Sequence, residues 1–457
     1  MTARTAGLPR TAAPRMQHRR QWRWRIIGAV LVTLLVAPLL IFALVGLPHV
    51  FRGPLVRIVM KEDATDRASA LDGPAFDTAL ELVTGARFTA GNSVEVLLNG
   101  DEIFPRLWHD LRAARRSITV QMYYAGPGAV IDSTVRILAE RARAGVPVFF
   151  LYDAFGAQTT PAPLLDTLRA SGVRVAEFGP IRWYALDRAN HRSHIRGIVI
   201  DAEIGYTGGF GLADKWLGGG RRRGEWRETN TRFEGPVVAQ LQATFVAKWA
   251  ETTGEIHEGS GLRATESAPA LPQAGALAAL AYSPALSGST LAERLIAMSI
   301  ASARQRLYIT NSYFIPQADF VELLVRAARR GVDVRVLTNG SRSDVESTWL
   351  AGRSRYETLL AGGVRIYEYQ PTTLHAKTFV ADGVWTSIGT MNFDNRSFAY
   401  NSEVALVTRD AAVGAVMESV FLTDLRLSEE IHLEAFRRRS RWMRLRERGA
   451  SALAGIL

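Results

Sequence analysis

Residues 375 to 403 read HAKTFVADGVWTSIGTMNFDNRSFAYNSE. Within this stretch His375, Lys377 and Asp382 have the spacing H-x-K-x(4)-D. The residues between Lys377 and Asp382 are β-branched or apolar, which is typical of a short buried strand. Because alternate side chains of a strand lie on the same face, His375 and Lys377 are predicted to point into one pocket.

This pair of side chains suits phosphodiester chemistry. An imidazole can attack phosphorus or protonate a leaving oxygen near neutral pH, and a lysine can balance the charge of phosphoryl oxygens. The alternative is a strand end with a surface histidine and lysine, because so short a motif has little specificity. The chain has only four lysines against fifty-one arginines, which favours a functional reason for Lys377.

A second copy of the pattern lies 181 positions upstream, in NHRSHIRGIVIDAEIGYTGG, residues 190 to 209. His194, Arg196 and Asp201 match the three motif residues described above. Internal repetition of this kind indicates that the chain consists of two related halves. The second copy brings a second histidine, so the sequence predicts one histidine from each half.

Further fragments repeat in the same order before each motif. The pairs are ARRSITVQMYY (114 to 124) with ARQRLYITNSYF (303 to 314), RARAGVPVFFLYD (141 to 153) with RAARRGVDVRVLTN (327 to 339), and LRASGVRVAEF (168 to 178) with LLAGGVRIYEY (359 to 369). Each half reads as strand, helix, strand, helix, strand and motif. The predicted fold class is therefore α/β, with sheets covered by helices.

The two motifs, together with YFIP, YEYQPTTLHAK and GTMNFDNRSFAYNSE, resemble the phospholipase D superfamily and, within it, bacterial cardiolipin synthases. The resemblance covers residues 93 to 430. It implies two tandem domains, each a mixed sheet flanked by helices, packed about a pseudo-twofold axis with both motifs in one cleft. The first motif departs from the family at Arg196, where the family has lysine, and at Gly211, where it usually has asparagine.

The chemistry and the resemblance together assign roles to the motif residues. One histidine attacks the phosphodiester to give a phosphohistidine, and the other protonates the departing alcohol and later deprotonates the incoming one. Lys377 and Arg196 neutralise the phosphoryl oxygens. The resemblance implies that Asp201 and Asp382 brace the motifs. Which histidine is the nucleophile stays open.

Four further residues complete the predicted site. The resemblance implies that Thr390 and Asn392 line the pocket. Glu228, in WRETNTRFEG, and Glu403, in NSEVALV, stand at equivalent places after each motif. A carboxylate against each imidazole would fix its tautomer and raise its basicity. The other histidines show no ligand spacing, so neither a metal nor another cofactor is expected.

Composition and charge limit the partners. The chain has 457 residues and no cysteine, which excludes disulfides and thiolate chemistry. The net charge of +11 is concentrated at the ends: residues 1 to 25 hold seven arginines, and residues 437 to 448 hold seven arginines and one glutamate. A near-neutral body with basic ends favours a membrane surface over nucleic acid. Solvated basic tails are the alternative.

The uncharged run at residues 26 to 47 predicts a transmembrane helix that anchors the protein in the cell membrane. The arginines before it predict a cytoplasmic N-terminus, and a single span then places the catalytic body outside the cytoplasm. Related synthases commonly have two spans and a cytoplasmic body, so the sidedness stays open. The sequence gives no indication of the oligomeric state.

The predicted boundaries follow from these segments. They are a basic segment (1 to 25), the transmembrane helix (26 to 47), a connector (48 to 92), the first domain (93 to 258), an Ala/Gly/Ser/Pro-rich linker (259 to 288), the second domain (289 to 430) and a basic C-terminal tail (431 to 457). The tail reads either as an amphipathic surface helix or as a frayed basic end.

The leading prediction is a membrane-anchored phosphatidyltransferase that joins two phosphatidylglycerol molecules and releases glycerol. The first alternative is a phospholipase D that transfers the phosphatidyl group to water, giving phosphatidic acid. A nuclease would share the catalytic groups, and a lipid-binding relic without activity is conceivable because of Arg196 and Gly211. The two histidines do not determine which alcohol accepts the phosphatidyl group, because water and a lipid hydroxyl require the same catalytic groups.

Overall fold

The computed structural model describes residues 15–41, 56, 59, 69–180, 190–263, 275–285 and 291–452. The chain divides into two compact units, residues 1–51 and residues 52–457. The larger unit contains both predicted halves and the whole sheet. Each unit is described by itself.

In the smaller unit, helix α1 (Arg15–Ile41) covers most of the predicted transmembrane segment, whose residues 42 to 47 lie outside the described residues. No helix in the described part of the chain is long and apolar enough to cross a membrane. The predicted transmembrane anchor stays a prediction, because residues 42 to 47 of the segment lie outside the described residues. The predicted sidedness rested on it and stays untested.

The larger unit is built on one mixed sheet. The strands of the first half are β1 (Thr89–Leu98), β2 (Ile118–Met122), β3 (Val148–Asp153), β4 (Arg174–Phe178), β5 (Arg192–Ser193), β6 (Gly197–Ile200), β7 (Ile204–Gly208) and β8 (Thr229–Glu234). Those of the second half are β9 (Ala276–Ser283), β10 (Arg306–Asn311), β11 (Asp333–Asn339), β12 (Arg365–Tyr369), β13 (Lys377–Ala381), β14 (Trp385–Gly389), β15 (Asn401–Arg409) and β16 (Ser428–Ile431).

The strand order is the same in both halves. From one edge it runs β4, β3, β2, β6, β7, β8, β1, and from the other side, after β16, it runs β12, β11, β10, β13, β14, β15, β9. The two series meet where β1 pairs with β9 in antiparallel register, with Thr89 opposite Ala278. In each half the first three strands of the series are parallel and the others antiparallel. The predicted α/β class with mixed sheets is confirmed.

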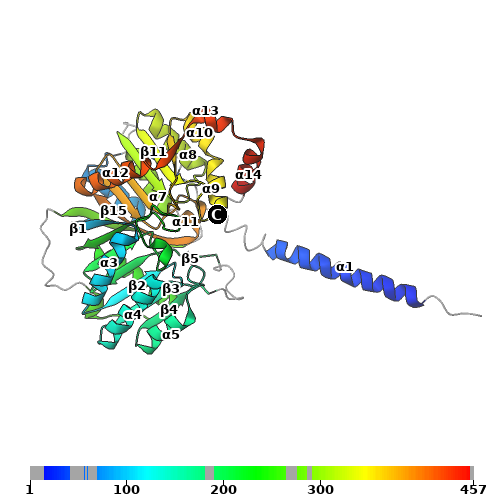
Figure 1. Ribbon diagram of the computed structural model, residues 1–457, viewed down its shortest axis with the longest axis horizontal. Coiled ribbons are helices and arrows are strands. Elements are labelled where there is room, and N and C mark those ends of the chain that lie inside the picture. The colour runs from blue at the N-terminus through cyan, green and yellow to red at the C-terminus, as the bar shows by residue number, and fades with distance from the viewer. Residues whose placement is uncertain are drawn as a thin grey trace, which may run out of the picture. The chain divides into compact units, whose positions relative to one another are not determined.

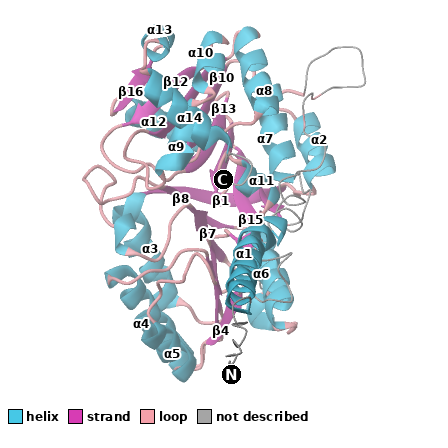
Figure 2. Ribbon diagram, turned by 90° about the vertical axis from the view of Figure 1, so that its right-hand side faces the viewer, coloured by secondary structure: helices cyan, strands magenta, loops and turns pink. Residues whose placement is uncertain are grey.

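Helices flank the sheet, as Figures 1 and 2 show. In chain order they are α2 (Pro74–Thr84), α3 (Asn99–Ala113), α4 (Ala129–Arg143), α5 (Ala162–Ala170), α6 (Val238–Thr253), α7 (Leu291–Ser302), α8 (Ala318–Arg329), α9 (Glu346–Arg353), α10 (Tyr356–Ala361), α11 (Asn395–Ala399), α12 (Ala411–Leu425), α13 (Leu433–Arg437) and α14 (Arg441–Ala452). In Figure 2, α3, α4 and α5 lie on one side of the first-half strands and α6 lies on the other.

Helix α3 and strands β2 and β13 contribute fully buried residues to the core. Ile103, Phe104, Leu107 and Leu111 lie on one face of α3 and are fully buried. Every residue of β2 is buried, because helices cover this strand on both faces of the sheet. The same holds for β13, which begins at Lys377 and places one motif inside the body.

The predicted linker at 259 to 288 is wrong for its second part. Residues 276 to 283, ALAALAYS, form β9, which pairs with β1 and β15 at the centre of the sheet. Ala278 and Ala279 have no exposed surface. Small side chains are needed here because helices and neighbouring strands approach closely, so the alanine content reflects crowding. Residues 264 to 274 and 286 to 290 lie outside the described residues.

The predicted connector and C-terminal tail are also more ordered than expected. Helix α2, inside the connector, buries Phe76 and Leu80 in the second-half core, with the Phe76 ring 4.9 Å from that of Trp385. The tail forms α13 and α14, with Glu447 buried to 1% exposure. Of the two interpretations of the tail, the structure supports the helix.

Candidate active site

The two motifs are placed by backbone pairing between the halves. Strand β5, just before His194, pairs in parallel with the start of β15, and the His194 N–H donates to Ser402 O at 3.0 Å. In the same way, the His375 N–H donates to Arg227 O at 2.8 Å. Each histidine therefore lies beside the chain segment that precedes a glutamate of the other half.

Each histidine pairs with the glutamate of the other half. His194 Nδ1 lies 2.9 Å from both carboxylate oxygens of Glu403, and His375 Nδ1 lies 2.7 Å from Glu228 Oε2. All four residues are buried, with at most 6% of their surface exposed. A carboxylate accepting from Nδ1–H fixes the tautomer that leaves the Nε2 lone pair available for chemistry.

A cation from the same motif contacts each imidazole. Arg196 Nη1 lies 3.1 Å from His194 Nε2, and Lys377 Nζ lies 3.1 Å from His375 Nε2 and 3.0 Å from its Nδ1. The predicted shared face of His375 and Lys377 is therefore observed. Both cations lie at the nitrogen that would attack or protonate a phosphodiester, where phosphoryl oxygens would be held.

The electrostatics show that both motifs belong to one site. The pKa of His194 is lowered to about 4, mainly by burial and also by the charges of Arg196 and Lys377, although Glu403 opposes the shift. Burial likewise lowers the pKa of His375 well below its usual value, with contributions from Lys377, Arg196 and His194 itself. Both imidazoles are thus neutral without substrate, and each feels the charges of the other motif.

The two carboxyl groups differ. Burial raises the pKa of Glu228 to about 7, although Lys377 and Arg196 oppose the shift. Burial acts in the same direction on Glu403, but His194 and hydroxyl donors outweigh it and hold its pKa below the usual value. Burial also lowers the pKa of Lys377 to about 7. The Glu228–His375–Lys377 group therefore gains or loses a proton near neutral pH.

The motif aspartates lie at turns away from the imidazoles. Asp201 accepts hydrogen bonds from the backbone N–H groups of residues 115 to 117, and Asp382 accepts from those of residues 304 to 306. Both have positive φ, 55° and 51°, a conformation that Asp tolerates better than most residues. These contacts fasten the motif hairpin to the loop before β2 or β10, in line with the bracing role.

Thr390 and Asn392 lie in the buried interior, and Thr390 Oγ1 donates to Glu403. Ser312 Oγ donates to Asn392 Oδ1 at 3.0 Å. The equivalent residues of the first half are Gly209 and Gly211. A Cβ at Gly209 would lie 2.4 Å from Glu228 Oε2, and one at Gly211 would lie 2.7 Å from the Trp216 ring. The departure from asparagine at Gly211 therefore accommodates an indole.

Two tyrosines were missed by the sequence analysis. The Tyr123 ring lies 4.6 Å from the His194 ring, and the Tyr313 ring lies 6.4 Å from the His375 ring, in both cases edge to face. They lie in the corresponding fragments QMYY and NSYF, just after β2 and β10, although the strand register makes Tyr124 the equivalent of Tyr313. A search of these repeated fragments for polar aromatic residues would have found them.

An aromatic group around Lys215 was also missed. Lys215 Nζ lies 3.6 Å from the ring centre of Tyr124 and 3.8 Å from that of Trp226. The Trp226 ring is 4.8 Å from the His375 ring. Burial lowers the pKa of Lys215 to about 8. Lys215 is one of only four lysines in the chain, and this rarity could have drawn attention to it. Its side chain adds a third cation beside the site.

Within the residues that the structure describes, no group of three or more His, Asp and Glu side chains could hold a metal ion. The expectation that catalysis needs no metal stays a prediction. The donor set around each histidine is one carboxylate and one cation, and the nearby cation opposes metal binding.

Comparison with known proteins assigns this site to a family. A family model described as "Cardiolipin synthase, PLD-like domain" matches residues 296–425. Cardiolipin synthase A of Pseudomonas syringae is 32% identical over 369 residues, covering 80% of this chain and 76% of that protein. The cardiolipin synthase of Geobacillus kaustophilus is 34% identical, covering 79% and 72%. The chain belongs to the cardiolipin synthase family.

Membership in the cardiolipin synthase family makes the chain a phospholipase D-type phosphatidyltransferase. The resemblance found from the motifs is therefore confirmed. Among solved structures, the phosphatidylserine synthase of Haemophilus influenzae superposes with a TM-score of 0.62 at 14% identity, covering 83% of this chain and 99% of that one. At this identity the likeness concerns the fold alone.

Proposed function

We propose that this enzyme makes cardiolipin by moving a phosphatidyl group from one phosphatidylglycerol to the free hydroxyl of a second, with release of glycerol. The observation that supports this function best is the pair of crossed His–Glu contacts, His194 with Glu403 and His375 with Glu228, in one buried site. Two neutral imidazoles with fixed tautomers provide one nucleophile and one proton carrier.

In the proposed mechanism His194 is the nucleophile. Its Nε2 forms a bond to phosphorus while the bond from phosphorus to the glycerol oxygen breaks. That oxygen takes the Nε2 proton of His375, which in the substrate complex carries the proton that the Glu228–His375 pair holds, so that His375 is left neutral. The neutral His375 then removes the proton of the incoming lipid hydroxyl, whose oxygen attacks phosphorus and releases His194. The transferred phosphorus is bonded to four oxygens in phosphatidylglycerol and again in cardiolipin, so the reaction consumes no water and needs no oxidant.

The assignment of the two roles follows from the carboxylates. Glu403 is held ionised, so it can stabilise the positive charge that develops on the ring of its partner His194 as Nε2 attacks phosphorus. The raised pKa of Glu228, about 7, lets the Glu228–His375 pair hold a proton at neutral pH, which suits a general acid. Arg196 and Lys377 would neutralise the phosphoryl oxygens as negative charge develops.

Transfer is proposed over hydrolysis because the site is buried and aromatic. Tyr123, Trp216, Trp226 and Tyr313 surround the imidazoles, which limits water next to the phosphohistidine. The family relatives are named as cardiolipin synthases. The acceptor in this proposal is a lipid hydroxyl at a membrane surface.

An assay with defined lipids tests the proposed reaction. Purified protein incubated with phosphatidylglycerol vesicles should yield cardiolipin and free glycerol in equal amounts. Phosphatidic acid as the sole product would establish a phospholipase D instead, and DNA cleavage without lipid turnover would establish a nuclease. Treatment with a chelator should leave the rate unchanged.

A trapping experiment tests the division of roles. The His375→Ala variant, rapidly quenched after mixing with phosphatidylglycerol, should accumulate a phosphatidyl adduct on the peptide that contains His194, because loss of the base slows the second step more than the first. The His194→Ala variant should form none. An adduct on His375 in the His194→Ala variant would reverse the assignment.

A further inference from the structure

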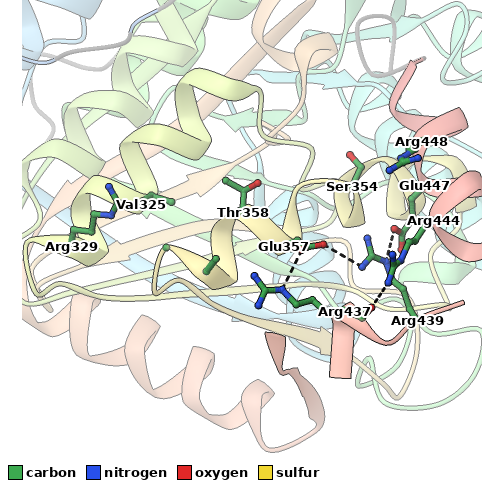
Figure 3. Close-up of a pocket in the computed structure, with 12 residues that line it drawn as sticks. Val325, Arg329, Ser354, Glu357, Thr358, Arg437, Arg439, Arg444, Glu447 and Arg448 are labelled. Carbon is green, nitrogen blue, oxygen red and sulfur yellow. Dashed lines mark hydrogen bonds and ion pairs between the residues drawn. The ribbon is translucent and has the colours of Figure 1, made fainter. Parts of the chain in front are cut away.

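A pocket of about 560 Å³ lies outside the active site, bordered by α8, α10, α13 and α14. Five arginines and two glutamates line it; the arginines are Arg329, Arg437, Arg439, Arg444 and Arg448. Figure 3 shows Arg444 and Arg448 of α14 beside Glu447, with Arg437 and Arg439 near Glu357. None of these residues belongs to either motif.

The two glutamates do not neutralise the pocket. Glu357 is shared by Arg437 at 3.3 Å and Arg439 at 3.7 Å. Glu447, only 1% exposed, accepts from Arg439 at 2.8 Å and also pairs with Arg353. The positive charge of the cluster therefore exceeds its negative charge.

Three arginines of the pocket have no acidic partner among the described residues: Arg329, Arg444 and Arg448. Arg444 donates through Nη2 to the backbone oxygen of Arg437, while its Nε is buried without a hydrogen-bond partner in the described part of the chain. A buried guanidinium N–H is normally paired, so this atom is suited to an anionic acceptor.

Helix α14 carries apolar side chains next to these arginines. Trp442 and Leu445 lie on one face at i and i+3 and are 67% and 60% exposed. Met443, Glu447 and Ala450 face the body of the protein. At 100° per residue, the stripe of Arg444 and Arg448 falls between the buried face and Leu445. Large apolar side chains beside arginines are typical of helices that lie in a membrane interface.

We propose that this pocket and α14 form a docking surface for a bilayer containing anionic phospholipid. Lipid phosphate groups enter the arginine pocket while Trp442 and Leu445 insert among the upper acyl chains. The arginine excess complements the anionic surface, and the exposed indole and leucine distinguish a bilayer from a soluble anion. The inference rests on the proposed function only in that both involve a lipid surface.

The absence of cysteine from the sequence permits a direct test. A single cysteine is introduced by Leu445→Cys in the full chain, labelled with a polarity-sensitive fluorophore, and reconstituted into vesicles of phosphatidylcholine alone or with phosphatidylserine. Phosphatidylserine supplies negative charge without being the proposed substrate. The label should shift to the blue only in the anionic vesicles, and high salt should reduce the shift. Leu82→Cys, on α2 and 82% exposed, is the control that should not respond.

Arginine variants test the role of the pocket. Arg444→Gln with Arg448→Gln, in the Leu445→Cys background, should lower the docking constant about 25-fold, because each arginine near an anionic surface strengthens binding about fivefold. The matched control is Arg112→Gln with Arg143→Gln, two exposed arginines of the first half, of which Arg112 also donates to a backbone carbonyl. This control should leave the constant unchanged.

Three results would overturn the proposal. They are an equal shift in neutral and anionic vesicles, a double arginine variant that docks like its control, and loss of the shift on adding inorganic phosphate, which would indicate a site for free anions. Activity on phosphatidylglycerol dispersed in nonionic micelles separates this proposal from the proposed function. The double variant should keep that activity, whereas failure of the proposed function would abolish it in the unmodified enzyme.

Discussion

Around His194, the partner carboxylate Glu403 receives hydrogen bonds from three side chains of the second half: Thr390, Ser397 at 2.8 Å and Asn401 at 3.1 Å. These donors favour the ionised form, and the pKa of Glu403 stays below its usual value although burial acts against it. The carboxylate next to His194 is therefore a fixed negative charge.

Around His375, the equivalent carboxylate of Glu228 receives fewer hydrogen bonds from neighbouring donors. Glu228 receives one backbone N–H, from Thr229 at 3.0 Å, and a long contact from the Trp216 indole at 3.4 Å. Gly209 stands where the second half has Thr390, so the hydroxyl donor is missing. Burial then raises the pKa of Glu228 to about 7. The same framework, with different supporting side chains, has produced one ionised and one proton-holding carboxyl group.

The largest expected effect is the loss of either histidine. His194→Ala and His375→Ala should each lower turnover about 10⁴-fold or more, and the double variant should be no worse than the poorer single variant, because both groups act in one reaction. Rates of cardiolipin formation from phosphatidylglycerol give the measurement. Near-normal activity of His194→Ala would mean that the first motif is a relic.

The second-largest loss of rate is expected for substitutions of the two glutamates, and the loss should differ between them. At pH 7, Glu403→Gln should lower the rate about 100-fold and Glu228→Gln about tenfold, because positioning carboxylates have effects of this size and glutamine imitates the protonated form of Glu228. The raised pKa of Glu228 means that it is protonated below about pH 7. Rate profiles of Glu228→Gln and the unmodified enzyme should therefore converge as the pH falls. Equal losses for both glutamines at every pH would contradict the comparison.

The motif cations should produce a smaller, pH-dependent difference. Burial lowers the pKa of Lys377 to about 7, so its charge is present below that pH and is lost as the pH rises through it. Lys377→Arg should move the alkaline limb of the rate profile upward by at least about one unit, because arginine stays protonated. Arg196→Lys should retain activity at pH 6 and add an alkaline limb. An alkaline limb that is unchanged in Lys377→Arg would assign it to another group.

The smallest effect on the rate is expected at the bracing aspartates. Asp201→Asn and Asp382→Asn keep the positive-φ turn but weaken bonds to three backbone N–H groups, which should lower the free energy of unfolding by about 1–3 kcal/mol each. Turnover of the folded enzyme should change less than about threefold. Denaturant unfolding and kinetics on the same samples measure both. A large loss of turnover at unchanged stability would place these carboxylates in the chemistry.

Local patterns were sufficient to predict much of the fold. Alternation and apolar runs predicted strands such as β2 and β13. Composition gave a wrong prediction for the buried central strand β9. The alanines of β9 read as a linker because composition does not report that a central strand between close neighbours needs small side chains.

The sequence by itself determined the chemical groups of the site, since His194, Arg196, His375 and Lys377 follow from two repeated motifs and the glutamates from their equivalent positions. Only the tertiary structure decided that each glutamate serves the histidine of the other half, across 209 residues for His194 with Glu403 and 147 for His375 with Glu228. Periodicity describes neighbours along the chain. These partners, and the different proton affinities of the two carboxyl groups, depend on which segments meet and on how far water is excluded when the halves pack together.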